Sequence, residues 1–240
     1  MLKEAGLTKC KQVFRRQVGK LQRLALIRPD IQFATKRLAR AMSSPTVEDE
    51  SRLKHLLKYL RGTTNYGAVL RPVQNLAKES TIDITAYSDS GWVGPLTQRK
   101  STSGVVIKLI NSTVCTYSRT QQTIAHSSAE AELHALTSSA AEVLYPRSIL
   151  LESKLTSGKF HITLHTDSSS GKSLAMRTGP GKRTRHVELR HFWIQELIKD
   201  GLLQIKKVAG VDNCADILTK YVTKDTLEKH LEATGLVTVA

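Results

Sequence analysis

Apolar residues recur along the first part of the chain with the period of a helix. Up to residue 62 they are spaced about three or four apart, which is typical of amphipathic helices. We expect three helices, over residues 11–27, 29–42 and 46–62. Pro29 suits a helix start, and Thr46 is a candidate N-cap for the helix that ends at Gly62. A short strand at 66–70 and a polar, proline-containing stretch at 71–80 then indicate a domain boundary.

From residue 81 the pattern changes to short β-rich runs separated by turn residues, which is typical of strands. We expect strands at 81–89, 104–110, 113–118, 161–166 and 203–208. We expect helices at 127–152, around 174–175, at 186–199, at 213–220 and at 223–233. Pro146 falls inside the first of these helices, where it should kink or end it.

The order of these elements predicts an α/β fold. Strands joined by short turns form an antiparallel meander, and strands that follow helices add in parallel through right-handed crossovers. We therefore expect a mixed five-stranded sheet in the order 3-2-1-4-5, with helices on both faces and a small helical segment before it.

The composition also indicates what kind of partner the chain binds. The formal net charge is +15, which favours a polyanion such as nucleic acid. The proposed nucleic-acid contacts form one basic cluster, Lys182, Arg183, Arg185, His186 and Arg190. No apolar run is long enough to span a membrane, and the N-terminus lacks the apolar core of a signal peptide. We therefore expect an intracellular protein, cytoplasmic or nuclear and not secreted, with no membrane partner and with its three cysteines as free thiols.

Four acidic residues are the candidate catalytic and metal-binding set. Asp89 and Asp167 each close a predicted strand, and these strands are expected to be neighbours. Glu132 lies in the first turns of a helix, and Asp216 lies just inside another. Carboxylates that converge at one sheet end repel each other and select hard cations such as Mg²⁺ or Mn²⁺. Two such ions about 3.5–4 Å apart are a common device for phosphodiester hydrolysis.

Each candidate has a structural alternative. Glu130 competes with Glu132, although Ser127 and Glu130 fit a capping box in which Glu130 bonds back to the N-cap amide. Asp167 could instead N-cap the helix that follows it. Asp216 could complement a helix dipole, and its rival is Asp212.

Several motifs together resemble the ribonuclease H domain of copia-type (Pseudoviridae) retrotransposon Pol polyproteins. The resemblance covers roughly residues 82–221. Its motifs are Tyr87-Ser88-Asp89-Ser90-Gly91-Trp92, Arg99-Lys100-Ser101-Thr102-Ser103-Gly104, Ser127-Ser128-Ala129-Glu130-Ala131-Glu132-Leu133, Thr184-Arg185-His186-Val187-Glu188 and Ala215-Asp216-Ile217-Leu218-Thr219-Lys220. Earlier segments, Arg28-Pro29-Asp30-Ile31 and Lys58-Tyr59-Leu60-Arg61-Gly62-Thr63, resemble the stretch after the polymerase palm.

The resemblance implies a ribonuclease H-like domain at 81–221, a helical remnant of the reverse transcriptase C-terminal region at 1–75 and a helical tail at 222–240. It also implies hydrolysis of the RNA strand of RNA–DNA hybrids by the four acids with two Mg²⁺ (or Mn²⁺) ions, and a reverse transcriptase domain as partner. Ser168 departs from the usual Asn after the third acid, Gly91 replaces a frequent acidic residue, and the loop at 209–212 has no His.

Two other functions stay open at this point. A decayed copy would leave a catalytically inactive nucleic-acid-binding remnant. An integrase- or resolvase-like nuclease would instead act on duplex DNA.

Overall fold

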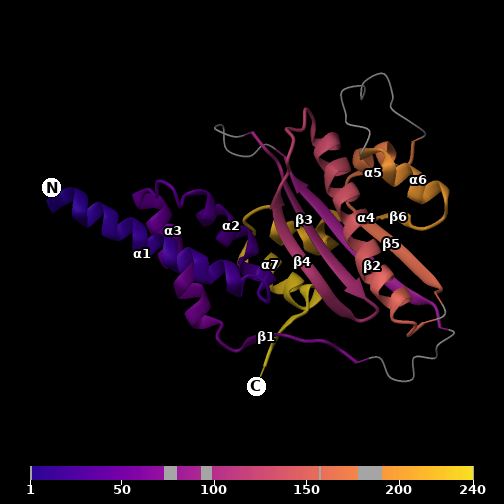
Figure 1. Cartoon of the computed structure of the whole chain (residues 1–240), viewed down its shortest axis with the longest axis horizontal. Helices are drawn as coiled ribbons and strands as arrows, with labels where there is room; N and C mark the ends of the chain where they lie inside the picture. Colours follow the sequence, from indigo (N-terminus) through magenta and orange to yellow (C-terminus); the bar gives the residue numbers. More distant parts are fainter. Residues whose placement is uncertain (1, 73–79, 93–98, 157, 178–190, 240) are drawn as a thin grey trace.

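The structure is a computed structural model that describes residues 2–72, 80–92, 99–156, 158–177 and 191–239, with side chains from residue 11 onward. The N-terminal region is helical, as predicted (Figure 1). Its elements are α1 (Leu2–Leu24), the 3-10 helix η1 (Pro29–Ile31), α2 (Gln32–Arg40) and α3 (Val47–Gly62). Thr46 caps α3 in a capping box with Asp49, and Phe14, Val18 and Leu38 belong to the core that joins the helices.

The second region contains the predicted five-stranded sheet. Its strands are β2 (Ile82–Gly91), β3 (Thr102–Leu109), β4 (Ser112–Thr120), β5 (Phe160–Thr166) and β6 (Gln204–Lys207). They lie in the order β4-β3-β2-β5-β6, which is the predicted order 3-2-1-4-5. β2, β3 and β4 pair antiparallel, whereas β5 joins β2 and β6 joins β5 in parallel. The predicted α/β class with a mixed five-stranded sheet is confirmed.

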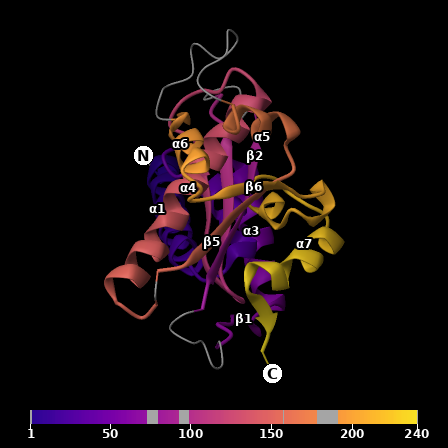
Figure 2. The ribbon, with the colours of Figure 1, turned by 90° about the vertical axis from the view of Figure 1, so that its right-hand side faces the viewer.

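Helical elements cover both faces of this sheet (Figures 1 and 2). One face packs against α4 (Ser128–Glu152), α5 (Ser169–Ala175) and α6 (Trp193–Lys199). The other face packs Val106 against the 3-10 helix η5 (Cys214–Leu218), which follows η4 (Gly210–Asp212). Gly104 permits this close approach, because a Cβ there would lie 2.8 Å from the Cβ of Leu218.

Several local predictions need correction. α4 continues through Pro146 to Glu152, so Pro146 does not end the helix. The helix expected at 213–220 is the shorter 3-10 helix η5. The helix expected at 186–199 is seen as α6, and residues 186–190 lie outside the described residues.

The end of the chain contains a strand that the sequence pattern did not predict. After α7 (Lys224–Leu231) and η6 (Glu232–Thr234) comes β7 (Leu236–Thr238). β7 pairs antiparallel with β1 (Tyr66–Ala68), the short strand that follows the N-terminal helices. A two-stranded ribbon has almost no local sequence signal, because its partner lies far away in the chain.

The N-terminal helices also contact the main sheet. Gln32 of α2 donates a hydrogen bond to the Thr116 hydroxyl of β4 at 2.8 Å, and Arg40 donates to the Thr120 hydroxyl at 2.7 Å. The domain division at 71–80 stays a prediction, and residues 73–79 lie outside the described residues. None of the described helices is long and apolar enough to span a bilayer.

Candidate metal centre

Three of the predicted acids meet at the end of the central strands. Asp89 is near the end of β2, Asp167 directly follows β5, and Glu132 lies in the second turn of α4. One carboxylate oxygen from each lies within 4.8 Å of the others. The parallel pairing of β2 with β5 explains the meeting, because it places the ends of both strands at one edge. The structure thus brings together Asp89, Glu132 and Asp167, as the sequence predicted.

Asp89 is a buried carboxylate with a fixed orientation. The Thr219 hydroxyl, just after η5, donates a hydrogen bond to it. The pKa of Asp89 is raised to about 6: burial is the largest cause and the negative charges of Asp216 and Asp167 add to it, whereas the Thr219 hydrogen bond and the charge of Lys220 act against it. An ionised Asp89 is therefore costly in this environment unless a cation compensates it.

Glu132 is even more perturbed. Burial is the largest cause that raises its pKa to about 8, followed by the charges of Asp89 and Asp167. Its Oε2 atom is buried and has no hydrogen-bond partner among the described residues. Gly171 of α5 packs against Glu132, since an added Cβ would come within 2.6 Å of the Glu132 Cβ. The glycine therefore lets α5 close over this side of the cluster.

Glu130, the rival of Glu132, has a structural position. The Ser127 hydroxyl accepts a hydrogen bond from the Glu130 amide at 3.2 Å, as the predicted capping box requires. The Glu130 carboxylate, however, accepts from the amide of His126 at 2.9 Å, whereas the prediction named the N-cap amide of Ser127. The amide that Glu130 binds is therefore one residue before the N-cap. Glu130 still caps the helix, which favours Glu132 as the ligand.

Asp167 is not used as a helix cap. Ser168 takes that position, and its hydroxyl accepts a hydrogen bond from the Gly171 amide at 2.9 Å. Asn213 then orients Asp167: its Nδ2 donates to Asp167 Oδ1 at 3.4 Å and to the Ser88 carbonyl at 3.0 Å. The Ser at position 168 therefore leaves the preceding carboxylate available to the cluster.

Asp216 lies beside the cluster and pairs with the ammonium of Lys220, which follows it in the same segment. Its Oδ2 atom is 2.7 Å from Lys220 Nζ, and its Oδ1 atom is buried with no hydrogen-bond partner among the described residues. It does not belong to the set of three that meet within 4.8 Å. Its rival, Asp212, is exposed and forms a surface ion pair with Lys229 of α7 at 2.8 Å.

The residues present fit divalent metal ions. All the converging donors are carboxylate oxygens, which are the ligands that Mg²⁺ and Mn²⁺ prefer. Two buried oxygens, Glu132 Oε2 and Asp216 Oδ1, lack partners among the described residues. Buried carboxylate oxygens without donors are costly, and a cation would compensate both.

Comparison with known proteins relates the chain to transposon polyproteins. No family model matches the chain. It is 30% identical over 226 residues to the "Retrovirus-related Pol polyprotein from transposon RE1" of Arabidopsis thaliana, an alignment that covers 94% of this chain. The chain is a relative of retrovirus-related Pol polyproteins from transposons. It is also 29% identical over 209 residues to the Pol polyprotein from transposon TNT 1-94 of Nicotiana tabacum, with 87% of this chain covered.

The chain spans only 15% of the length of each of these Pol polyproteins. Among solved structures, LC11-RNase H1 isolated from compost matches 63% of this chain and 98% of its own, with 17% sequence identity and a TM-score of 0.43.

Some residues of the site were missed by sequence reasoning. Asn213 and Thr219 each bind one of the predicted acids, and Lys220 binds a third. Thr219 and Lys220 lie in the motif that runs from Ala215 to Lys220, and Asn213 lies just before it, so the motif was the available signal for the first two only. Their partners depend on how η5 packs against β2 and β3, which local sequence does not specify.

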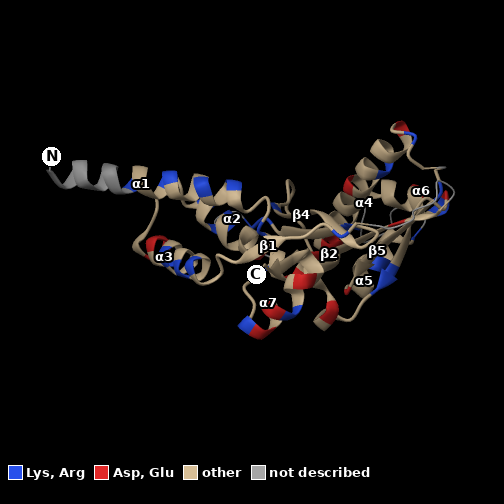
Figure 3. Ribbon diagram, turned by 90° about the horizontal axis from the view of Figure 1, so that it is seen from below, with Lys and Arg blue, Asp and Glu red and all other residues tan. Residues whose placement is uncertain are grey.

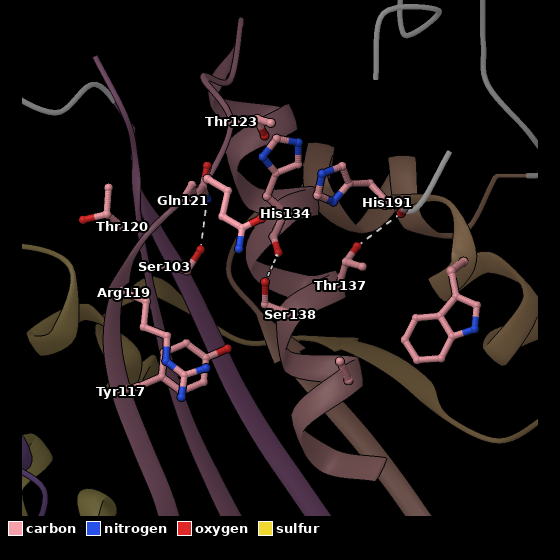
Figure 4. Close-up of a pocket in the computed structure, with 13 residues that line it drawn as sticks. Ser103, Tyr117, Arg119, Thr120, Gln121, Thr123, His134, Thr137, Ser138 and His191 are labelled. Atoms are coloured by element: carbon pink, nitrogen blue, oxygen red, sulfur yellow. Dashed lines mark hydrogen bonds between the residues drawn. The ribbon is translucent and has the colours of Figure 1, made fainter. Parts of the chain in front are cut away.

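The basic cluster Lys182, Arg183, Arg185, His186 and Arg190 lies outside the described residues, so its role stays a prediction. The chain becomes described again at His191, which lines a cavity of about 360 Å³ on another side of α4 (Figure 4). The rings of His191 and His134 stack there with centroids 3.8 Å apart. The Thr137 hydroxyl donates to the His191 carbonyl at 3.2 Å, which fixes this segment against α4.

Proposed function

We propose that this chain is a metal-dependent endoribonuclease that hydrolyses the RNA strand of RNA–DNA hybrids as part of a retrotransposon polyprotein. The observation that carries the proposal is the convergence of Asp89, Glu132 and Asp167 from three separate elements. The motif resemblance and the relationship to Pol polyproteins support the same activity. Asp216 is proposed as the fourth acid of the set.

The chain's residues hold and orient the reacting groups. Asp89, Glu132, Asp167 and Asp216 would hold two Mg²⁺ or Mn²⁺ ions. Such ions, when bound, activate a water molecule and stabilise the leaving oxygen. Thr219 and Asn213 fix the orientations of Asp89 and Asp167, so that little reorganisation is needed when the substrate arrives.

The high positive charge supports a nucleic-acid substrate. Lysine and arginine recur along α1 and α3 (Figure 3), and the sequence places a further basic cluster directly before His191. Such residues would contact phosphates and position the hybrid without reading its sequence. We expect Arg183→Ala with Arg185→Ala to weaken hybrid binding and to reduce the slope of log affinity against log salt by up to about two. An unchanged slope would show that these basic residues face solvent and do not contact the phosphates.

The deciding experiment is cleavage of an end-labelled RNA–DNA hybrid with and without Mg²⁺, with double-stranded RNA and duplex DNA as controls. Asp216→Asn should abolish cleavage, and the matched Asp212→Asn should retain it because Asp212 pairs with Lys229 at the surface. Binding without cleavage by the unaltered chain would indicate the inactive remnant. Cleavage of duplex DNA would indicate the integrase-like alternative.

A further inference from the structure

Lys220 brings a positive charge to the edge of the acidic cluster. Its ammonium is 2.7 Å from Asp216 Oδ2; the Lys220 side chain is 54% exposed and that of Asp216 only 13%. Burial alone would lower the pKa of Lys220, but the hydrogen bond to Asp216 and the charges of Asp89, Asp216 and Asp167 together raise it. The ammonium therefore pairs directly with Asp216, and the charges of Asp89 and Asp167 also favour its protonated form.

The backbone around Lys220 holds this charge in place. The amides of Thr219 and Lys220 both donate to the Asp216 carbonyl, at 3.1 and 3.2 Å. The neighbouring Thr219 hydroxyl binds Asp89. Gly91 at the end of β2 allows the approach, since a Cβ there would lie 2.9 Å from the Thr219 carbonyl oxygen. Lys220 thus starts from a backbone position that is fixed against the cluster.

This pair explains why Asp216 does not join the other three carboxylates. Asp89, Glu132 and Asp167 form a common set of oxygens, whereas one oxygen of Asp216 faces Lys220. The other oxygen, Oδ1, is buried without a hydrogen-bond partner among the described residues and remains available to a ligand. One oxygen of Asp216 is therefore already paired with an ammonium, and the other is not.

We propose that Lys220 is a positioning residue that acts as an internal counter-cation: it neutralises Asp216 in the metal-free chain and competes with a divalent cation for that carboxylate. The inference rests on the metal centre of the proposed function and adds a regulatory element to it. A divalent cation at Asp216 must displace the ammonium, because like charges at this distance repel strongly in a partly desolvated site. The three-carboxylate position fills first, and the Asp216 position fills at higher cation concentration.

The test is a titration of the full chain with Mg²⁺, and separately with Mn²⁺, followed by thermal unfolding and by isothermal calorimetry without nucleic acid. Lys220→Met should lower the melting temperature of the metal-free chain and shift the weaker binding midpoint to roughly tenfold lower cation concentration. Lys220→Arg keeps the charge and should stay near the unaltered chain. Lys224→Met is the matched control, because Lys224 forms an exposed pair with Glu228 at the same spacing.

The outcomes separate this inference from the proposed function. If the unaltered chain binds no divalent cation, both the metal centre and the competition are wrong. If it binds and Lys220→Met leaves the midpoints unchanged, Lys220 has only a structural role and the inference is overturned. If Lys220→Met weakens cation binding, Lys220 supports the metal site and does not compete with it, which also overturns the inference. Hybrid cleavage by the unaltered chain would stand in both latter cases.

Discussion

Two regions of this molecule bury charged groups in opposite ways. In the helical region, Arg28 and Asp30 form a pair whose side chains are 6% and 0% exposed. Arg28 also donates to the carbonyl and the hydroxyl of Thr63, and the Tyr59 hydroxyl donates to Asp30 at 2.7 Å. At the end of the sheet, the carboxylates of Asp89, Glu132 and Asp167 instead face each other, and one of their oxygens, Glu132 Oε2, is buried with no hydrogen-bond partner among the described residues.

The difference separates a structural site from one that requires a ligand. A buried pair with all its hydrogen bonds made needs nothing further, whereas converging carboxylates leave a deficit of positive charge. Variants that remove one charge should therefore have opposite effects in the two regions. Loss of a charge should destabilise the helical region, but it should reduce the electrostatic repulsion among the carboxylates of the metal-free cluster.

The largest effect on stability is expected from Arg28→Met, which leaves Asp30 buried without its partner. The free energy of unfolding should fall by roughly 3–5 kcal/mol, as measured by denaturant unfolding. Arg71→Met is the control, since Arg71 and its partner Glu232 are both exposed, and it should cost less than about 1 kcal/mol. Equal losses of unfolding free energy in both variants would show that the buried pair contributes no more to stability than an exposed pair.

A pH effect of intermediate size should come from Glu132 and Asp89. Their pKa values rise to about 8 and about 6 in the folded chain, from ordinary values of 4.5 and 3.8. The folded, metal-free chain therefore binds more protons than the unfolded chain, and its stability should fall as the pH rises from about 4 to about 8.

The measurement is denaturant unfolding across this pH range with a chelator present. Glu132→Gln should flatten the dependence, and Asp212→Asn, at the exposed carboxylate beside η5, should not. A dependence that persists unchanged in Glu132→Gln would contradict the assignment of this carboxylate to the cluster.

The smallest stability change, of opposite sign to the first, is expected from Asp89→Asn. It removes one repelling charge and should stabilise the metal-free chain by about 1 kcal/mol. It should also remove the rise in melting temperature that Mg²⁺ gives the unaltered chain by mass action. A destabilised Asp89→Asn chain that keeps its Mg²⁺ response would show that this acid is structural.

The sequence predicted those parts that follow from order along the chain. Asp89 and Asp167 were assigned to one sheet edge because the pattern of strands and helices requires parallel neighbours, and β2 and β5 are such neighbours. Glu130 was correctly given a capping role, although its partner amide is that of His126. The roles of Lys220 and Asn213 could not be predicted, because their contacts depend on packing between η5 and strands far away in sequence.

The pairing of β1 with β7 has a consequence for how the chain could be divided. The two regions are connected by noncovalent contacts as well as by the chain itself. These are the pairing of β1 with β7 and the hydrogen bonds from α2 to β4. Arg71, at the start of the expected boundary, hydrogen-bonds Ser112 and pairs with Glu232 at 2.7 Å. A single cut just after Arg71 would therefore yield two polypeptides that remain associated. They would separate only when a denaturant disrupts the β1–β7 pairing and the contacts between α2 and β4.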